Sequence, residues 1–338
     1  MAKINLQQRY IKGRFNLPIV TLICLLTWIG AHYLGAHTDP EALVNTANWG
    51  YSEYPLDLPI WLNQIIAFAG YGILAYLLII LNNTFSIINL RATVQSTTFL
   101  ILIATIPQIH YIYPGLASTI LILAASHFFF QTYKVYDSSE LYYYIGFFWG
   151  LSFLILPKTI FLFPLFLLAA IPFSSVNIRT FFSALLGIIT PIWIMFCYCY
   201  LTDSMYLFYI PFTDLFSWGN LEAYKSLDGN NLITFVFALT LVILSITYLL
   251  LSQPRMKIKT YYILNYFFVL SIGLIVIMIF NPIHFYQYIP LCIAGVSFIF
   301  SNVLVTYQNK MSNIIFMITL GILLMILATN IWMPLYNS

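Results

Sequence analysis

The chain has 338 residues, of which 62% are hydrophobic and only 7% are charged. Soluble domains average about 25% charged residues, so the composition excludes a soluble globular protein and a disordered chain. The apolar runs are long and unbroken, which also excludes a β-barrel built from short alternating segments. The sequence therefore predicts an all-α fold, a polytopic bundle of transmembrane helices.

Eleven apolar segments are candidate spans within a single integral membrane domain, residues 1–338. Most have the ~17–25 residues that a bilayer core requires. The pair 141–156 and 159–173 is short, and one span plus a re-entrant piece is the alternative there. In chain order, the predicted spans are residues 17–36, 60–81, 94–112, 115–131, 141–156, 159–173, 181–200, 232–251, 261–280, 285–305 and 313–332.

The basic residues set the predicted orientation. Four of them precede the first span, which favours a cytoplasmic N-terminus and an uncleaved signal anchor. With eleven spans, 11 of the 13 Lys and Arg residues fall inside, and only Lys158 and Lys225 fall outside. Merging the two short spans would destroy this asymmetry, so we predict eleven spans and an outer C-terminus.

The acids follow the opposite pattern, since eight of the ten fall in the predicted outer segments. They concentrate in two outer loops, residues 37–59 and 201–231. The inner loops are short and basic, as is usual for anchors against anionic lipid. The outer face is therefore the better candidate for chemistry.

The first outer loop offers carboxylates with two interpretations. Asp39 could cap a short helix that begins at Pro40, with Glu41 in its first turn. Alternatively, Asp39 could act as general base on a sugar hydroxyl, or bind a cation, with Asp57 as the second choice. Asp57 precedes the second span, where a merely interfacial role is the alternative.

Three other side chains are candidates at the outer face. Lys158 lies between two short spans, where it either snorkels to lipid headgroups or holds a phosphate. Trp218 either sits in the membrane interface or stacks on a sugar ring. His284 is either interfacial or, with His110 and residues of the first loop, part of a metal or proton-transfer site that the spacing does not require. We assign no metal ligand.

Common catalytic signatures are missing from the sequence. It contains no Walker A loop, no dinucleotide glycine fingerprint and no HExxH motif. It also lacks the basic exposed surface that a nucleic-acid partner would need.

The stretch from about residue 82 to residue 203 resembles a family of uncharacterised inner-membrane proteins of Bacteroidota-type bacteria. That family has no established activity, but the resemblance implies a bacterial inner (cytoplasmic) membrane protein with many spans. The residues that carry it are Asn82-Asn83, Arg91, 128–133, 146–152, Leu156-Pro157-Lys158, Pro191 and Asp203.

More loosely, the same stretch is similar to the membrane core of GT-C glycosyltransferases. These enzymes commonly have an acidic first outer loop, a Gly-x-x-x-Gly-Leu span and a lysine before the next short span. The counterparts here are Asp39 or Asp57, the run from Gly146 to Leu151, and Lys158. The first loop lacks the adjacent acidic pair of many members, and the 338 residues contain no large outer C-terminal domain. The glycine spacing also fits a helix-packing face.

This resemblance implies a sugar transferred from a polyprenyl-phosphate carrier to an acceptor at the outer face. Asp39 or Asp57 would be the base and Lys158 would hold the phosphate, with Glu41, His284 and Trp218 as further substrate-binding residues. The alternative is a non-enzymatic assembly or scaffold subunit that docks an envelope protein partner. A transporter is the third hypothesis, disfavoured because mid-span polar residues are few. Membrane lipids are partners under every hypothesis.

Overall fold

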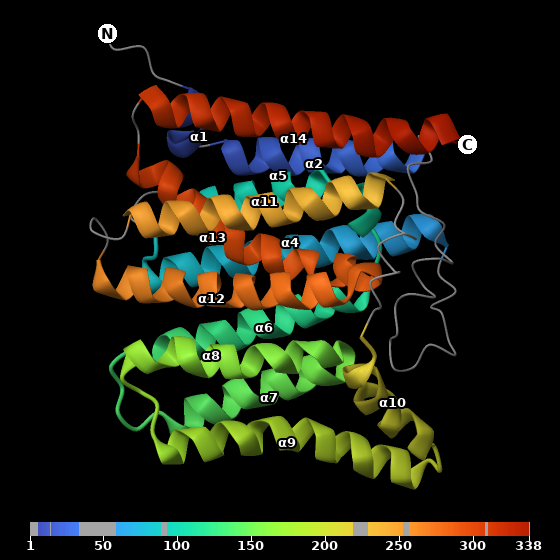
Figure 1. Ribbon diagram of the computed structural model, residues 1–338, viewed down its shortest axis with the longest axis vertical. Helices are drawn as coiled ribbons and strands as arrows, with labels where there is room; N and C mark the ends of the chain where they lie inside the picture. The colour runs from blue at the N-terminus through green and yellow to red at the C-terminus, as the bar shows by residue number, and fades with distance from the viewer. Residues whose placement is uncertain are drawn as a thin grey trace.

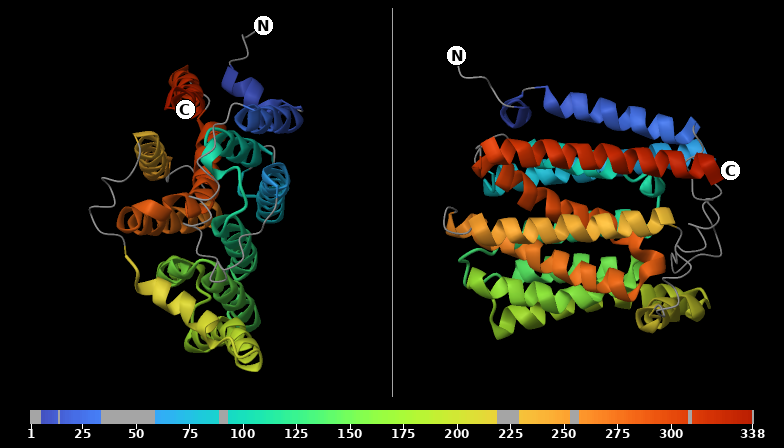
Figure 2. Two further views of the ribbon diagram at one scale, coloured as in Figure 1. Left: turned by 90° about the vertical axis from the view of Figure 1, so that its right-hand side faces the viewer. Right: turned by 45° about the horizontal axis from the view of Figure 1, so that its top comes forward.

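The computed structural model describes residues 6–13, 15–33, 59–88, 93–218, 229–252, 257–307 and 310–337. Within these ranges all regular structure is helical and no strand occurs. The long helices run side by side, roughly parallel or antiparallel, with α9 and α14 at opposite edges of the bundle (Figure 1). Figure 2, at left, looks along the helices and shows that the bundle is elongated in cross-section.

Seven helices in the described ranges are long and apolar enough to cross a membrane, so the chain is an integral, multi-pass membrane protein. Each of the seven coincides with a span expected from the sequence. They are α2 (Asn16–Tyr33), α4 (Ile60–Phe85), α6 (Pro114–Gln131), α9 (Ile178–Leu201), α12 (Ile258–Phe280), α13 (Ile289–Thr306) and most of α14 (Lys310–Asn337).

Four more helices lie within or overlap the other predicted spans, and two short helices lie outside the predicted spans. The helix α1 packs against α13 and α14, and α10 packs against the end of α9. The sequence did not predict α10, which lies within residues 201–231, the segment expected to be the second outer loop. The six helices are α5 (Val94–Ala104), α7 (Ser139–Ile155), α8 (Leu162–Ala170), α11 (Gly229–Ser252), α1 (Leu6–Lys12) and α10 (Met205–Phe216).

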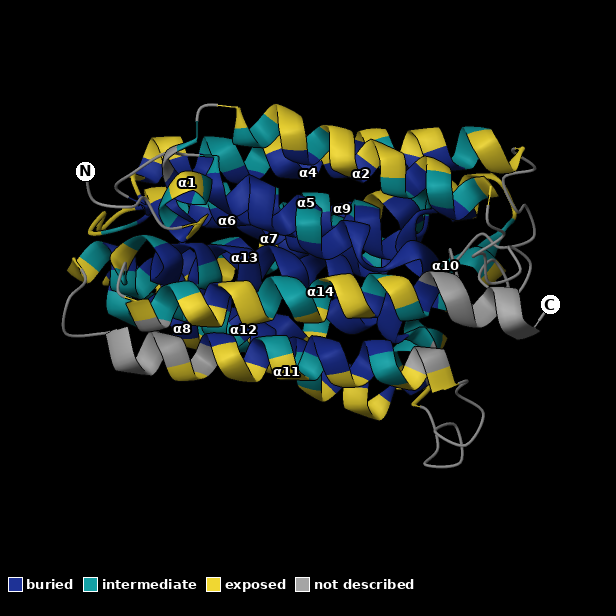
Figure 3. Cartoon of the chain, turned by 90° about the horizontal axis from the view of Figure 1, so that it is seen from above, coloured by how far each residue is buried: buried dark blue, intermediate teal, exposed yellow. Residues whose placement is uncertain are grey.

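Burial divides the bundle into a central part and a periphery. The apolar window of α13 is 83% buried, because α13 packs against α5, α6, α11 and α12. The window of α14 is only 11% buried, and large apolar side chains such as Leu324 point away from the protein. Figure 3 shows this arrangement, with buried residues in the middle and exposed ones along α2, α11 and α14. An apolar exterior of this kind is expected where the surrounding solvent is lipid.

The glycines of α7 form a helix-packing face. A Cβ atom built on Gly146 would lie 2.0 Å from the carbonyl oxygen of Ala184 in α9. In the other direction, a Cβ on Gly187 would lie 2.2 Å from the carbonyl oxygen of Tyr143. The two backbones are thus in direct contact, which favours the packing interpretation of the glycine spacing.

Three short 3₁₀ helices that begin with proline lie near the same end of the bundle, which we call the Lys158 end. The opposite end, where α14 begins, is the Lys310 end. The three are η1 (Pro107–Ile109), η2 (Pro157–Phe161) and η6 (Pro282–Gln287); a fourth, η3 (Ile171–Phe173), lies toward the Lys310 end.

The first of these breaks corrects a predicted boundary. The span expected over 94–112 ends as an α-helix at Ala104. Pro107 has no N–H to donate and disfavours helical backbone at Ile106, whose φ and ψ are −122° and 84°. The chain continues through the buried residues Ile109 and His110. Non-helical backbone at such depth is tolerated where protein surrounds it.

Candidate functional site

Lys158 is buried at the connection between α7 and α8. The residue is only 2% exposed, so its side chain does not snorkel to the protein surface. Its Nζ lies 5.6 Å from the centroid of the Trp218 ring. The described part of the chain contains one ion pair, Arg179 with Asp137, so no described carboxylate pairs directly with Lys158.

Local sequence explains how Lys158 reaches this position. Pro157 forces Leu156 out of the helical region, to φ −136° and ψ 86°, so α7 ends and η2 begins. Thr159 then fixes the turn, because its Oγ1 donates to the carbonyl oxygen of Leu156 at 2.7 Å. The Ser152 hydroxyl lies 3.2 Å from the Thr159 hydroxyl and 2.7 Å from that of Ser118 in α6.

Two opposing effects act on the Lys158 ammonium. Burial lowers the pKa of Lys158, because desolvation disfavours the charged form. The negative charge of Asp214 on α10 works in the other direction and raises it. The Asp214 carboxylate also accepts a hydrogen bond, because Ser217 Oγ donates to Asp214 Oδ1 at 2.8 Å. Lys158 therefore lies within the field of one acid without a direct ion pair.

Aromatic rings enclose the same region. The Trp218 ring packs on Phe161 at the end of η2, with centroids 5.3 Å apart, and on Phe280 at the end of α12, 6.1 Å apart. Trp218 nevertheless stays 41% exposed. The structure thus brings together Lys158 and Trp218, two of the residues selected from the sequence, and leaves the tryptophan partly exposed beside the lysine.

The 3₁₀ helix η6 follows the end of α12, where Phe280 packs on Trp218. It carries His284, which is half-buried, and it ends at Tyr288. Tyr288 is buried, hydrogen-bonds with Asn281 and lies within the field of Asp214. No three His, Cys, Asp or Glu side chains gather within the described ranges, so His284 and His110 do not form a metal site with other described residues.

The predicted carboxylates of the first outer loop lie outside the described residues. Asp39, Glu41 and Asp57 all fall within 34–58. Their assignment as base and substrate ligand therefore remains a prediction from the sequence.

A second polar region, which the sequence did not predict as a unit, surrounds the 3₁₀ helix η1 that follows α5. We call it the Gln64 cluster, and it comprises Gln64, His32, Tyr71, Tyr111 and Tyr113. Gln64 Oε1 lies 2.8 Å from His32 Nδ1, and Gln64 also hydrogen-bonds with Tyr111. The hydroxyls of Tyr71 and Tyr113 are 2.8 Å apart. The signal in the sequence was a polar stretch between Pro107 and Pro114 within an apolar run.

Neighbouring contacts tie the Gln64 cluster to the rest of the bundle. The His110 and Trp28 rings stack with centroids 3.4 Å apart at 10°. Asn330 of α14 donates through Nδ2 to the carbonyl oxygen of Thr105 at 2.9 Å and accepts from Gln108 at 3.5 Å. The bond from Asn330 satisfies the Thr105 carbonyl oxygen, which the end of α5 leaves without a helical partner.

Comparisons with protein-family models, curated proteins and solved structures find no match to this chain. The functional argument therefore rests on the chemistry of the residues.

Proposed function

We propose that the chain is a GT-C-like membrane glycosyltransferase whose sugar donor is carried on polyprenyl phosphate, and that Lys158 binds the donor phosphate. The observation that carries the proposal is a lysine only 2% exposed, with no direct ion pair to a described carboxylate. A buried ammonium is costly unless an anion pairs with it. A phosphate supplies that anion, and a compact ammonium suits it.

Trp218 supplies the second element of the proposed site. Its partly exposed ring lies beside the ammonium, where a sugar attached to the phosphate would stack on it. Asp214 raises the pKa of Lys158 through its negative charge, against the lowering by burial, and makes no direct ion pair with it. His284, on the neighbouring break, is a further substrate ligand in this proposal.

The proposed reaction is a displacement at the anomeric carbon. Asp39, or Asp57 as second choice, takes the proton of the acceptor hydroxyl, whose oxygen then bonds to the anomeric carbon. The bond from sugar to phosphate oxygen breaks, and its electron pair leaves with the polyprenyl phosphate. Lys158 stabilises the negative charge that grows on this leaving group. Tyr33 and Pro59, which flank the first outer loop with Asp39, Glu41 and Asp57, both lie at the Lys158 end.

The proposal includes eleven spans, a cytoplasmic N-terminus, an outer C-terminus and a place in the bacterial inner membrane. Beyond the seven long helices, α5, α7, α8 and α11 occupy the other predicted spans, and successive helices run in opposite directions. This order supports placing Lys134, Arg179, Lys257 and Lys310 at the cytoplasmic end, and the Lys158 end at the outer face.

The test is purification in mild detergent followed by mass spectrometry of the lipids and proteins that co-purify. Wild type is expected to retain a polyprenyl phosphate, and Lys158→Ala is expected to lose it. Lys134→Ala is the matched control, because Lys134 is an exposed lysine at the opposite end. A stoichiometric protein partner with no such lipid in any sample would overturn the proposal in favour of an assembly subunit.

A further inference from the structure

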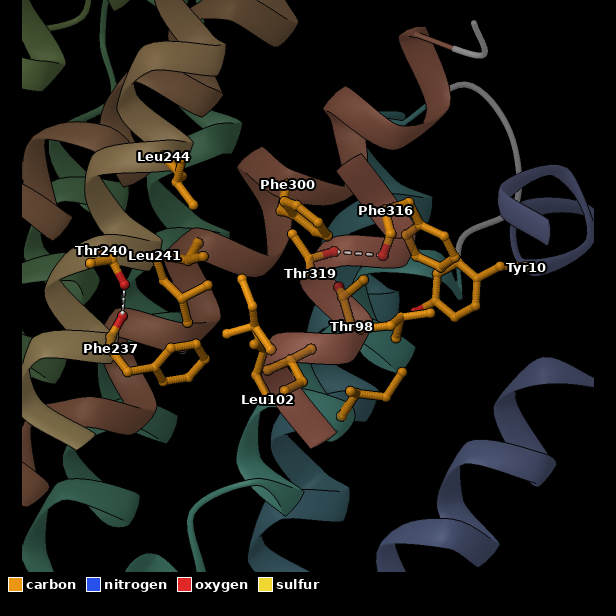
Figure 4. Close-up of a pocket in the computed structure, with 15 residues that line it drawn as sticks. Tyr10, Thr98, Leu102, Phe237, Thr240, Leu241, Leu244, Phe300, Phe316 and Thr319 are labelled. Carbon is orange, nitrogen blue, oxygen red and sulfur yellow. Dashed lines mark hydrogen bonds between the residues drawn. The ribbon is translucent and has the colours of Figure 1, made fainter. Parts of the chain in front are cut away.

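A groove lies between α5, α11, α13 and α14 (Figure 4). We call it the Thr319 groove. It is separate from the region around Lys158 and does not depend on the proposed function. The residues used below are Tyr10, Thr98, Thr240, Phe316, Thr319 and Leu323, all of which line it.

The polar atoms of the groove are already hydrogen-bonded within the protein. Thr319 Oγ1 donates to the carbonyl oxygen of Phe316, and Thr240 Oγ1 to that of Phe237, each at 2.8 Å. The Thr98 hydroxyl lies 2.8 Å from that of Ser301. The remaining lining is mostly aliphatic and aromatic, so the groove suits an apolar occupant.

The depth of the groove matches one leaflet of a membrane. Along α14, Phe316 lies six residues and Leu323 thirteen residues beyond Lys310. At 1.5 Å per residue, these positions are about 9 and 20 Å from the start of the helix. Half of the hydrocarbon core is about 15 Å thick. The faces of α11 and α14 carry exposed Ile243 and Leu324, so acyl chains are the apolar groups nearest to the groove.

Two cations lie at the Lys310 end of the groove. The helix α1 is fastened to the start of α14, because the Gln7 backbone N–H donates to Asn313 Oδ1 at 3.1 Å and its Nε2 to Ser312 Oγ at 3.0 Å. Tyr10 of α1 thereby packs on Phe316, with ring centroids 5.3 Å apart. Arg9, next to Tyr10, and Lys310 are both exposed at this end.

We propose that the Thr319 groove binds one acyl chain of an anionic phospholipid from the leaflet at the Lys310 end, with its phosphate beside Arg9 and Lys310. The apolar lining takes the chain, and the two cations complement the negative headgroup. This is a site for one retained lipid, distinct from the exchanging lipid that surrounds any membrane protein.

The first test fills the groove and counts retained phospholipids by native mass spectrometry in mild detergent. Thr319→Phe is expected to reduce the bound fraction of one phospholipid at least fivefold. Ile318→Phe is the matched control, because Ile318 directly precedes Thr319 in α14 and is 56% exposed. Thr240→Phe fills the groove from α11 and must give the same loss. Agreement between the two variants shows that the loss does not come from misfolding of one of them.

The second test adds phosphatidylglycerol or phosphatidylcholine to the delipidated protein. Lys310→Gln is expected to abolish a preference for phosphatidylglycerol that the wild type and Lys257→Gln retain. Lys257 is the control because it is also exposed, at the start of α12. Equal retention by the filled-groove variants and Ile318→Phe, no headgroup preference in wild type, or an isoprenoid lipid in the groove would each overturn the proposal.

Discussion

The Lys158 region and the Gln64 cluster arise in the same way but have opposite electrostatic character. Each lies at the Lys158 end, where a proline interrupts a helix and leaves non-helical backbone buried. The Gln64 cluster contains amide, phenol and imidazole groups, several of which hydrogen-bond with one another, such as Gln64 with His32. The Lys158 region contains a buried ammonium without a direct ion pair among the described residues.

This contrast indicates that the Gln64 cluster serves stability and that the Lys158 region is prepared for a ligand. Neutral groups that satisfy one another stabilise a fold, since losing one partner leaves the other unpaired. A buried charge without a partner contributes little to stability, because desolvation offsets what it gains. Substitutions in the two regions should therefore have opposite effects on lipid retention and on the free energy of unfolding.

Substitution of Lys158→Met should separate binding from stability. A charge-assisted contact with phosphate contributes about 1.5–3 kcal/mol, so retention of the lipid phosphate should fall by about 10- to 150-fold. The free energy of unfolding should stay equal or increase, because an apolar side chain replaces a buried amine. Lipid mass spectrometry and thermal unfolding in one detergent measure the two effects. A large loss of stability with unchanged lipid would reverse the assignment.

Substitution of Gln64→Leu should have the opposite outcome. It leaves His32 and Tyr111 without one hydrogen-bond partner each, which should cost about 1–3 kcal/mol of unfolding free energy. Retention of polyprenyl phosphate should not change. Gln131→Leu on the exposed surface of α6 is the control and should stay within about 0.5 kcal/mol of wild type. Loss of the lipid in Gln64→Leu would mean that the two regions are coupled.

Lys158 should make a contribution of its own to the pH dependence of stability. Because burial lowers the pKa of Lys158 in the fold, the unfolded chain binds more protons at pH values between the lowered pKa and about 10.4. The free energy of unfolding should therefore rise with pH across that window, and Lys158→Met should abolish the rise. Lys257→Met, which removes an exposed lysine, should leave it intact.

The phosphate affinity should change with pH in the reverse direction. It should fall as pH rises, because the ammonium loses its proton. Asp214→Asn removes the charge that raises the Lys158 pKa, so this fall should begin at lower pH in that variant. Titrations of lipid binding against pH measure both midpoints, and identical midpoints would exclude electrostatic coupling between Asp214 and Lys158.

The smallest effect is expected at the exposed ion pair between Arg179 and Asp137. Their N–O distance is 3.1 Å, but the two side chains are 74% and 60% exposed. Such pairs contribute about 0–1 kcal/mol. Arg179→Gln should therefore change the melting temperature only slightly and leave lipid binding unchanged. A larger change would mean that surface charges influence the bundle as strongly as the two buried regions do.

The sequence predicted the helical segments well where apolar length alone decides them. The span expected over 115–131 is α6, Pro114–Gln131. The prediction was wrong where a proline interrupts an apolar run. The span expected over 94–112 ends as an α-helix at Ala104. The sequence also missed α10, a short helix of 12 residues that is not long enough to register as a span.

The candidate site was only partly predictable for a similar reason. Lys158 is conspicuous because it is one of two predicted outer cations, and Trp218 because it is aromatic. Their proximity depends on how α10 folds back over η2, which no local pattern reveals. The Gln64 cluster as a whole was not predicted, because its members come from three segments that lie far apart in the sequence.

The helix α13 is synthesised after the four helices α5, α6, α11 and α12 against which it packs. This central helix is among the last to leave the ribosome, yet it supplies partners to early helices. Ser301 meets Thr98 across 203 residues of sequence, which take roughly 10–40 s to synthesise. During that interval α5 is already in the bilayer with its hydroxyl partner still absent. Insertion and assembly are therefore separate stages, and the newly made first half must persist in the membrane as an unfinished bundle.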